Sequence, residues 1–161
     1  MRGRVRLQGL TAALLTLCWL LQACAEEPRG PEAQLRATVA AAERAAEAKN
    51  LGAVKALISQ RYADDRGQDR KAFEAVLTLT FLRNQTIHLL TRVDSIELPE
   101  PKRAQLRVFV AMAGGPLSGA ADLLRMRAHL YRFDLDLEDE DGGDWKLTSA
   151  EWRPAEPEDF F

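Results

Sequence analysis

The side chains best suited to chemistry in this sequence are two histidines and the acids that could pair with them. His88, Asp94, His129 and Asp134 all fall in stretches where apolar and polar residues alternate, which is typical of β-strands. A histidine beside a carboxylate can act as a general acid or base near neutral pH. A strand histidine is more often half-exposed or hydrogen-bonded, so we assign no catalytic residue. His88, Asp94 and His129 form the candidate polar site.

The sequence supports a metal site less than it supports a histidine–carboxylate pair. Two histidines without a clear third ligand make a poor metal site. The acid-rich run DLDLEDEDGGD at 134–144 offers many carboxylates, but its spacing does not fit a calcium-binding loop. Its second half is better explained as the solvated tip of a hairpin. We therefore expect no metal and no cofactor.

The N-terminal segment, residues 1–23, indicates export. Arg2, Arg4 and Arg6 form a basic start, and an apolar run follows at 10–21. This run is shorter than the roughly 20 residues that a transmembrane helix needs, and it is apolar on all sides, unlike a core helix. A basic start, a short apolar run and a small residue before a cleavage point are typical of a secretory signal.

The end of this segment, Leu21-Gln22-Ala23-Cys24, resembles the lipobox of bacterial lipoproteins, although Gln22 replaces the usual small or β-branched residue. The resemblance implies cleavage before Cys24, a diacylglyceryl thioether on its sulfur and acylation of the new amino end. The alternative is an ordinary secretory signal cut near Ala23 or Ala25. Ala25 in place of Asp favours the outer membrane. Residues 24–31 would be the lipidated Cys and a short tether. The seven residues after Cys24 span at most about 25 Å, so the domain would face the periplasm close to the membrane.

Export also limits the cysteine chemistry and changes the charge. Cys18 leaves with the signal and the Cys24 thiol would hold lipid, so no cysteine remains for a disulfide, a catalytic thiolate or a metal site. Without Arg2, Arg4 and Arg6 the chain holds 19 lysines and arginines against 24 acids, a net charge of −5. An acidic protein lacks the basic surface that nucleic acid needs, so we expect no nucleic-acid partner.

Residues 32–155 have the length of one domain, and 156–161 form an acidic C-terminal tail. The first third predicts three helices. One has Leu35, Val39, Ala42 and Ala46 on one face, a second at 51–60 is capped by Asn50, and a third lies at 69–84. From residue 87 the period changes to two, which predicts strands at 87–98, 106–112, 124–137 and 145–152.

The apolar phase flips within the third strand, between Leu130 and Phe133, and within the last strand, between Ser149 and Trp152. One extra residue in a strand, a β-bulge, produces such a flip. We place the bulge of the last strand near Ser149–Ala150. The two flips lie roughly opposite each other across the hairpin at 141–143, and a pair of matched bulges would bend the sheet sharply.

Two stretches, AAEAKNLGAVKALISQRYADDRG at 45–67 and GGDWKLTSAEWRP at 142–154, resemble the NTF2-like superfamily, also called SnoaL- or ketosteroid-isomerase-like. The resemblance covers most of 32–155. It implies an α+β fold in which N-terminal helices pack on a strongly bent antiparallel sheet to form a cone. Members include isomerases, dehydratases, transport factors and binding modules, so the fold does not assign an activity. The Asp base, Tyr and protonated Asp of the isomerases have no counterparts that we can place here.

One face of the predicted sheet is basic and aromatic. The residues with the phase opposite to the core are Arg92, Arg107, Phe109, Arg125, Arg127, His129 and Tyr131. Arginine and aromatic residues are enriched at interfaces, and in the family the exposed sheet face often makes a homodimer. We therefore expect Arg107, Phe109, Arg127 and Tyr131 to mediate association with a second copy or with another envelope protein. The alternative is a solvated face whose arginines pair with Asp94 or Glu97.

These observations together predict a lipid-anchored, periplasm-facing NTF2-like module that binds without catalysing. Its ligand is either a small apolar molecule inside the cone or a protein on the open sheet face. The alternative is a SnoaL- or ketosteroid-isomerase-like enzyme, an isomerase or dehydratase, that uses a His/Asp pair. Whether side chains fill the cone or leave a cavity distinguishes these possibilities.

Overall fold

The structure is a computed structural model, and it describes residues 30–116 and 128–160. The predicted signal at 1–23, the lipidation candidate Cys24, Arg125 and Arg127 lie outside these residues. Three helices come first, α2 (Pro31–Glu47), α3 (Leu51–Ala56) and α4 (Arg70–Arg83). The strands follow, and a short 3-10 helix, η1 (Pro157–Phe160), comes last.

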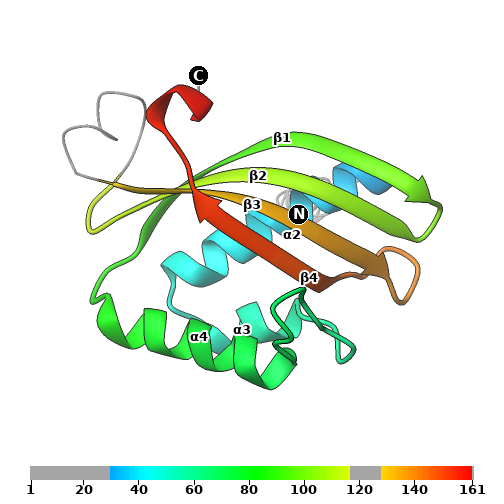
Figure 1. Ribbon diagram of the computed structural model, residues 1–161, viewed down its shortest axis with the longest axis horizontal. Helices are drawn as coiled ribbons and strands as arrows, with labels where there is room; N and C mark the ends of the chain where they lie inside the picture. The colour runs from blue at the N-terminus through cyan, green and yellow to red at the C-terminus, as the bar shows by residue number, and fades with distance from the viewer. Residues whose placement is uncertain (1–29, 117–127, 161) are drawn as a thin grey trace, which may run out of the picture.

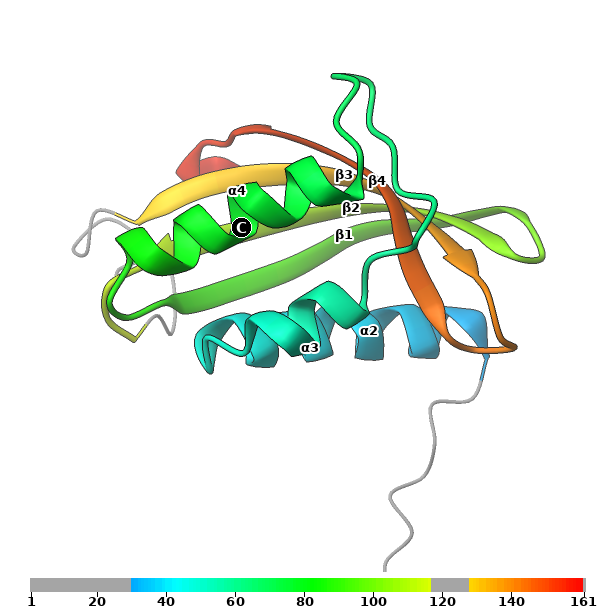
Figure 2. The ribbon, with the colours of Figure 1, turned by 90° about the horizontal axis from the view of Figure 1, so that it is seen from below.

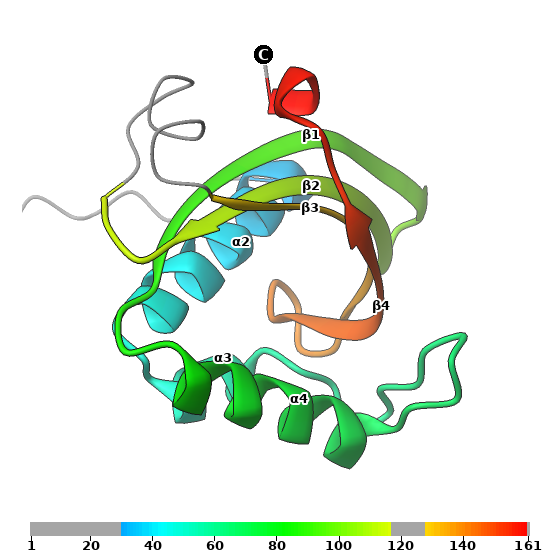
Figure 3. The same ribbon diagram turned by 60° about the vertical axis from the view of Figure 1, so that its left-hand side comes forward.

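The strands form one antiparallel sheet in the order β1-β2-β3-β4: β1 (His88–Glu100), β2 (Arg103–Ala113), β3 (His129–Asp139) and β4 (Trp145–Pro154). The sheet arches over the helices, which lie on its inner side, while η1 lies on the outer side (Figure 1 and Figure 3). Figure 2 views the molecule from the side of α3 and α4, with the strands behind them. The expected α+β fold, with N-terminal helices packed on a strongly bent antiparallel sheet, is confirmed.

Short-range interactions set the helix ends. Asn50 caps α3, as predicted, because its side chain accepts a hydrogen bond from the Ala53 N–H at 3.0 Å. α3 is shorter than the expected 51–60. After Ala56 the chain pairs with β4, where the Ser59 N–H donates to the Leu147 carbonyl at 2.9 Å. Asp69 caps α4 by accepting from the Ala72 N–H at 2.8 Å.

The bend of the sheet depends on bulges in its two edge strands. In β4 the extra residue is Thr148, since Leu147 pairs with Leu137 and Ser149 pairs with Asp136. This bulge lies one to two residues before the predicted position. It puts both Leu147 and Ala150, which are an odd number of residues apart, on the inner face, as the phase flip indicated. In β1 the extra residue is Asp94, which the sequence analysis did not identify as a bulge.

The bulge predicted in the third strand is wrong. The pairing of β2 with β3 runs unbroken from Arg103–Glu138 to Met112–His129. The phase flip has another cause, because Leu130 faces the outer side and packs on a small cluster that contains Phe109, Ala111 and Phe160. Two apolar environments, one on each face of the same strand, produced the flip without an extra residue.

Part of the acidic C-terminal tail, 156–161, has a defined structure. Within it, η1 folds back on the outer face of the sheet, and Phe160 is only 5 % exposed. The Phe160 and Phe109 rings lie 5.7 Å apart between centroids. The Glu156 N–H donates to the Asp159 carboxylate at 3.0 Å, so one of the acids helps to form the turn.

Two apolar clusters hold the helices against the inner face. The larger one joins α2 to the sheet and consists of Leu35, Ala104, Leu106, Val108, Leu137 and Trp145. The smaller one joins the α3–α4 region to β4 and consists of Ile58, Tyr62, Phe73 and Ala150. Among the described residues, no helix combines the length and the apolar character that crossing a membrane requires.

We predict that Trp145→Ala lowers the free energy of unfolding by about 3–5 kcal/mol, because Trp145 is 2 % exposed and its Nε1 donates to Gln34 at 3.2 Å. Urea denaturation followed by circular dichroism measures the change. Leu82→Ala is the control, because Leu82 is 75 % exposed and its truncation should cost about 0.5 kcal/mol or less. Equal effects of the two substitutions would contradict the assignment of Trp145 to the core.

Candidate functional site

The cone is not filled by side chains. A cavity of about 490 Å³ lies between the inner face of the sheet and helices α2, α3 and α4. Five aromatic residues contribute to its wall: Phe73, Phe81, Tyr131, Phe133 and Trp152. Most of the remaining wall is aliphatic, from Val39, Ala42, Ala46, Val54, Val76, Leu77, Ile87, Leu89, Val108, Val110, Met112 and Leu135. The size and the apolar wall are typical of small-molecule sites.

The cavity exists because small residues face large ones across a wide cone. α2 contributes Ala42 and Ala46 to the wall, and each supplies only a methyl group. On the opposite side, α4 is held at its first turn, where the Phe73 ring stacks on Tyr62 at 4.7 Å. The later turns of α4 supply Leu77, Thr80 and Phe81 to the wall. Short side chains on α2 leave the space between the two helices open.

The polar groups in the wall are few. On α2, the Glu43 carboxylate accepts a hydrogen bond from the Thr91 hydroxyl on β1 at 2.5 Å. On α4, the Thr80 hydroxyl donates to the Val76 carbonyl at 3.0 Å, so this group is satisfied within its own helix. The sequence analysis missed Glu43. Glu43 follows Val39 by four residues, so it lies beside the apolar face of the predicted helix. This position is the sequence feature that could have identified it as a residue of the cavity wall.

The three members of the candidate polar site do not come together. Leu89 lines the cavity, so the neighbouring His88 lies on the outer phase of β1. Asp94 is six residues further along β1, or roughly 20 Å at the rise of a strand. It pairs with Arg92 at 3.2 Å instead of a histidine. His129 is exposed and pairs in register with Met112 on the inner phase.

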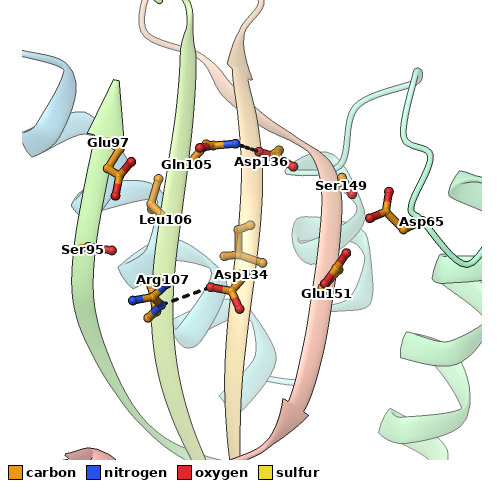
Figure 4. A pocket seen from close by; sticks show the side chains of 11 residues that line it. Asp65, Ser95, Glu97, Gln105, Leu106, Arg107, Asp134, Asp136, Ser149 and Glu151 are labelled. Atoms are coloured by element: carbon orange, nitrogen blue, oxygen red, sulfur yellow. Dashed lines mark hydrogen bonds and ion pairs between the residues drawn. The ribbon is translucent and has the colours of Figure 1, made fainter. Parts of the chain in front are cut away.

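Among the described residues, the arginines on the outer face of the sheet lie beside acids. Figure 4 shows the shallow pocket of this face, about 260 Å³, where Arg107 lies among carboxylates from several strands. The acids that line it are Asp65, Glu97, Asp134, Asp136 and Glu151. Arg107 contacts Asp134 at 3.2 Å and Asp94 at 3.9 Å, so the alternative of arginines paired with Asp94 is correct for this residue.

The other proposed interface residues are placed differently from our expectation. Phe109 does point to the outer face, but Phe160 covers it and leaves it 6 % exposed. Tyr131 points the other way and lines the cavity, because the unbroken register puts it opposite Val110 on the inner face. Arg127 lies outside the described residues. Arg107 is therefore the one member of the described set that remains partly exposed on the outer face.

Neighbouring charges shift two carboxyl groups on this outer face. Partial burial alone would raise the pKa of Asp134, but hydrogen bonds from Arg132 and Arg107 outweigh it and hold that pKa below its ordinary value. The Glu151 carboxyl shows the opposite effect, because a hydrogen bond and charge repulsion from Asp65 raise its pKa. Across the described ranges, no group of three or more histidine, cysteine, aspartate or glutamate side chains is arranged to hold a metal ion.

Comparisons with known proteins identify the fold. No protein-family model and no curated protein matches the sequence. Solved structures do match. One is described as an NTF2-like-family candidate dehydratase from Streptomyces avermitilis, at 14% identity and a TM-score of 0.61, covering 78% of this chain and 97% of that one. The fold is NTF2-like.

Two further solved structures are similar. A candidate scytalone dehydratase from Novosphingobium aromaticivorans has 12% identity and a TM-score of 0.61, covering 76% of this chain and 83% of that one. An NTF2-like protein of unknown function from Shewanella oneidensis has 13% identity and a TM-score of 0.58, covering 76% of this chain and 98% of that one. Similarity at this level concerns the fold, because unrelated activities share it.

We predict that Asp134→Asn makes stability less dependent on pH. A carboxyl with a lowered folded-state pKa stabilises the fold above its unfolded pKa of about 3.9, and this contribution is lost as the pH falls through the folded value. The wild type should therefore lose more stability than the variant between roughly pH 5 and pH 3. Urea midpoints across this range measure the difference. Arg132→Gln, which removes the hydrogen bond that most lowers the pKa, should flatten the profile in the same direction, and parallel curves would refute the assignment.

Proposed function

We propose that this protein is a lipid-anchored, periplasm-facing module that binds a small apolar ligand inside its NTF2-like cone and does not catalyse. The observation that supports it most is the cavity of about 490 Å³ with its aromatic and aliphatic wall. This apolar wall faces a space that is open to water, and a ligand would cover it. Filling the cavity with an apolar molecule would also remove that molecule from water, which is the main source of affinity for such ligands.

A catalytic role is the alternative, an isomerase or dehydratase of the SnoaL or ketosteroid-isomerase type with a His/Asp pair. Similar structures described as dehydratases make this class worth naming. Neither His88 nor His129 is among the residues that line the cavity, and Asp94 is far from both along the sheet. General acid–base chemistry needs the two groups within hydrogen-bond reach of the substrate. The described lining thus supports binding better than it supports that reaction.

A protein partner on the open sheet face, whether a second copy or another envelope protein, is a weaker proposal. It was based on four side chains. Of these, Tyr131 lines the cavity and Phe160 covers Phe109. Arg107 already pairs with Asp134, so a partner would have to compete with that bond.

The proposed location depends on the N-terminal sequence. The segment that ends in Leu21-Gln22-Ala23-Cys24 supports lipidation at Cys24, and Ala25 supports the outer membrane. Lipid chains would then keep the cone close to the bilayer, because the tether before α2 is short. A carrier or sensor of apolar molecules at the membrane surface is consistent with this location.

We predict that Ala42→Phe blocks the cavity and lowers the affinity for N-phenyl-1-naphthylamine, a neutral probe that fluoresces in apolar surroundings, by at least about tenfold. Ala75→Phe is the matched control, because Ala75 is exposed on α4 and does not line the cavity. Fluorescence titration gives the dissociation constants, and thermal unfolding checks that both variants fold. Equal binding by the two variants would place the probe elsewhere, and no binding by the wild type would argue against the proposed function.

We also predict that Cys24→Ala abolishes incorporation of a radioactive fatty acid and removes the protein from the membrane fraction, or leaves its signal uncleaved. The reason is that the Cys24 thiol would be the attachment point for lipid. Cys18→Ala is the control and should still take up label, because Cys18 precedes the cleavage point. Wild-type protein without label, or found in the soluble periplasm, would contradict the lipoprotein assignment.

A further inference from the structure

We infer that the ligand of the cone is an apolar molecule with one cationic group, such as a protonated amine, and that Glu43 binds this group. The inference rests on the proposed function, because it names the chemical class of the molecule in the same cavity. It adds the charge of the ligand to its apolar character. An aliphatic or aromatic wall alone does not distinguish a cation from a neutral or anionic molecule of equal size.

The first step is the state of the Glu43 carboxylate. Its hydrogen-bond donor among the described residues is the Thr91 hydroxyl, and none of the described lysines or arginines forms an ion pair with it. A carboxylate has about four lone-pair positions for donors, so most of its capacity stays open. A charge beside an apolar wall is poorly solvated, and a cation brought by the ligand would compensate it.

The second step excludes a simple structural explanation for Glu43. Glu47 lies one turn further along α2, and its carboxylate accepts from the Leu89 N–H of β1 at 3.0 Å. This bond already ties α2 to the edge strand and satisfies a backbone donor. Glu47 does not line the cavity, whereas Glu43 does. A neutral acceptor at residue 43 could accept the same hydrogen bond from Thr91. None of the described contacts therefore requires the negative charge of Glu43.

The third step is the composition of the wall opposite Glu43. Thr91, Val110 and Tyr131 lie in one row across β1, β2 and β3. Two strand spacings separate the first from the last, or roughly 10 Å, which is enough for a ring system between Glu43 and Tyr131. Phe133 and Trp152 continue the aromatic wall. Aromatic faces attract cations, so they act in the same direction as the carboxylate.

One lining residue acts in the opposite direction. Arg83, the last residue of α4, would attract an anion. Its side chain is exposed, whereas Glu43 is only partly exposed. Water and salt screen an exposed charge much more than a partly buried one. Glu43 should therefore determine the charge preference of the cavity.

The experiment uses three molecules with the same apolar body and different charges: 1-aminoadamantane, 1-adamantanol and adamantane-1-carboxylate. Each displaces N-phenyl-1-naphthylamine from the purified full chain at neutral pH. We expect the amine to displace the probe at a concentration at least about tenfold lower than the alcohol, and the carboxylate to be the weakest. Glu43→Gln should abolish the preference for the amine over the alcohol. Glu47→Gln, the matched control outside the cavity, should retain it.

The outcomes separate this inference from the proposed function. If the wild type binds the neutral probe but the three molecules displace it equally, or the carboxylate displaces it best, the inference is overturned and the apolar cavity remains a binding site. If Glu43→Gln folds and keeps the preference, Glu43 is not the binding group and the inference is also overturned. If Glu43→Gln does not fold, the wild-type ranking decides. If the wild type does not bind the neutral probe, the proposed function fails first.

Discussion

The architecture depends on one extra residue in β4. Thr148 has no partner in the register between β3 and β4, and this bulge allows Trp145 and Trp152 to approach the same side of the sheet. Trp145 belongs to the cluster with α2, while Trp152 packs on the cluster with Phe73. A regular strand would have turned one of them outward. The bulge therefore joins both apolar clusters to a single strand, and the cone exists because that strand bends.

A bent sheet encloses more space than the two clusters fill. The cluster with α2 lies toward the hairpin end of β4, and the cluster with Phe73 lies toward its other end. The space left over is lined by residues from all four strands and three helices, so no single element determines its shape. Substitutions in the wall can therefore change which ligands fit. A substitution at Ala42, for example, alters the volume of the cavity, and Ala42 belongs to neither apolar cluster.

Much of the fold could be predicted from the sequence, because the apolar period is a local property. The change of period after α4, the cap at Asn50 and the bulge in the last strand all followed from neighbouring residues. The errors came from long-range contacts. Leu130 packs on a cluster that includes Phe160, thirty residues later, and no local pattern showed that partner. The site was harder for the same reason: the link between Glu43 and Thr91 joins a helix to a strand 48 residues away.

The attachment of α4 also has a kinetic consequence. Its first turn is fixed by Phe73, which packs on Tyr62 and Trp152, whereas Lys49 contacts the chain just past its other end at Asn84. In the last turns Phe81 is buried, but Leu79 and Leu82 beside it are 50 % and 75 % exposed, so one large apolar side chain holds that end. Segments with few buried contacts open at a lower free energy than the whole domain. We therefore expect this end of α4 to set how fast molecules enter and leave the cone, so that residence time and affinity can change independently.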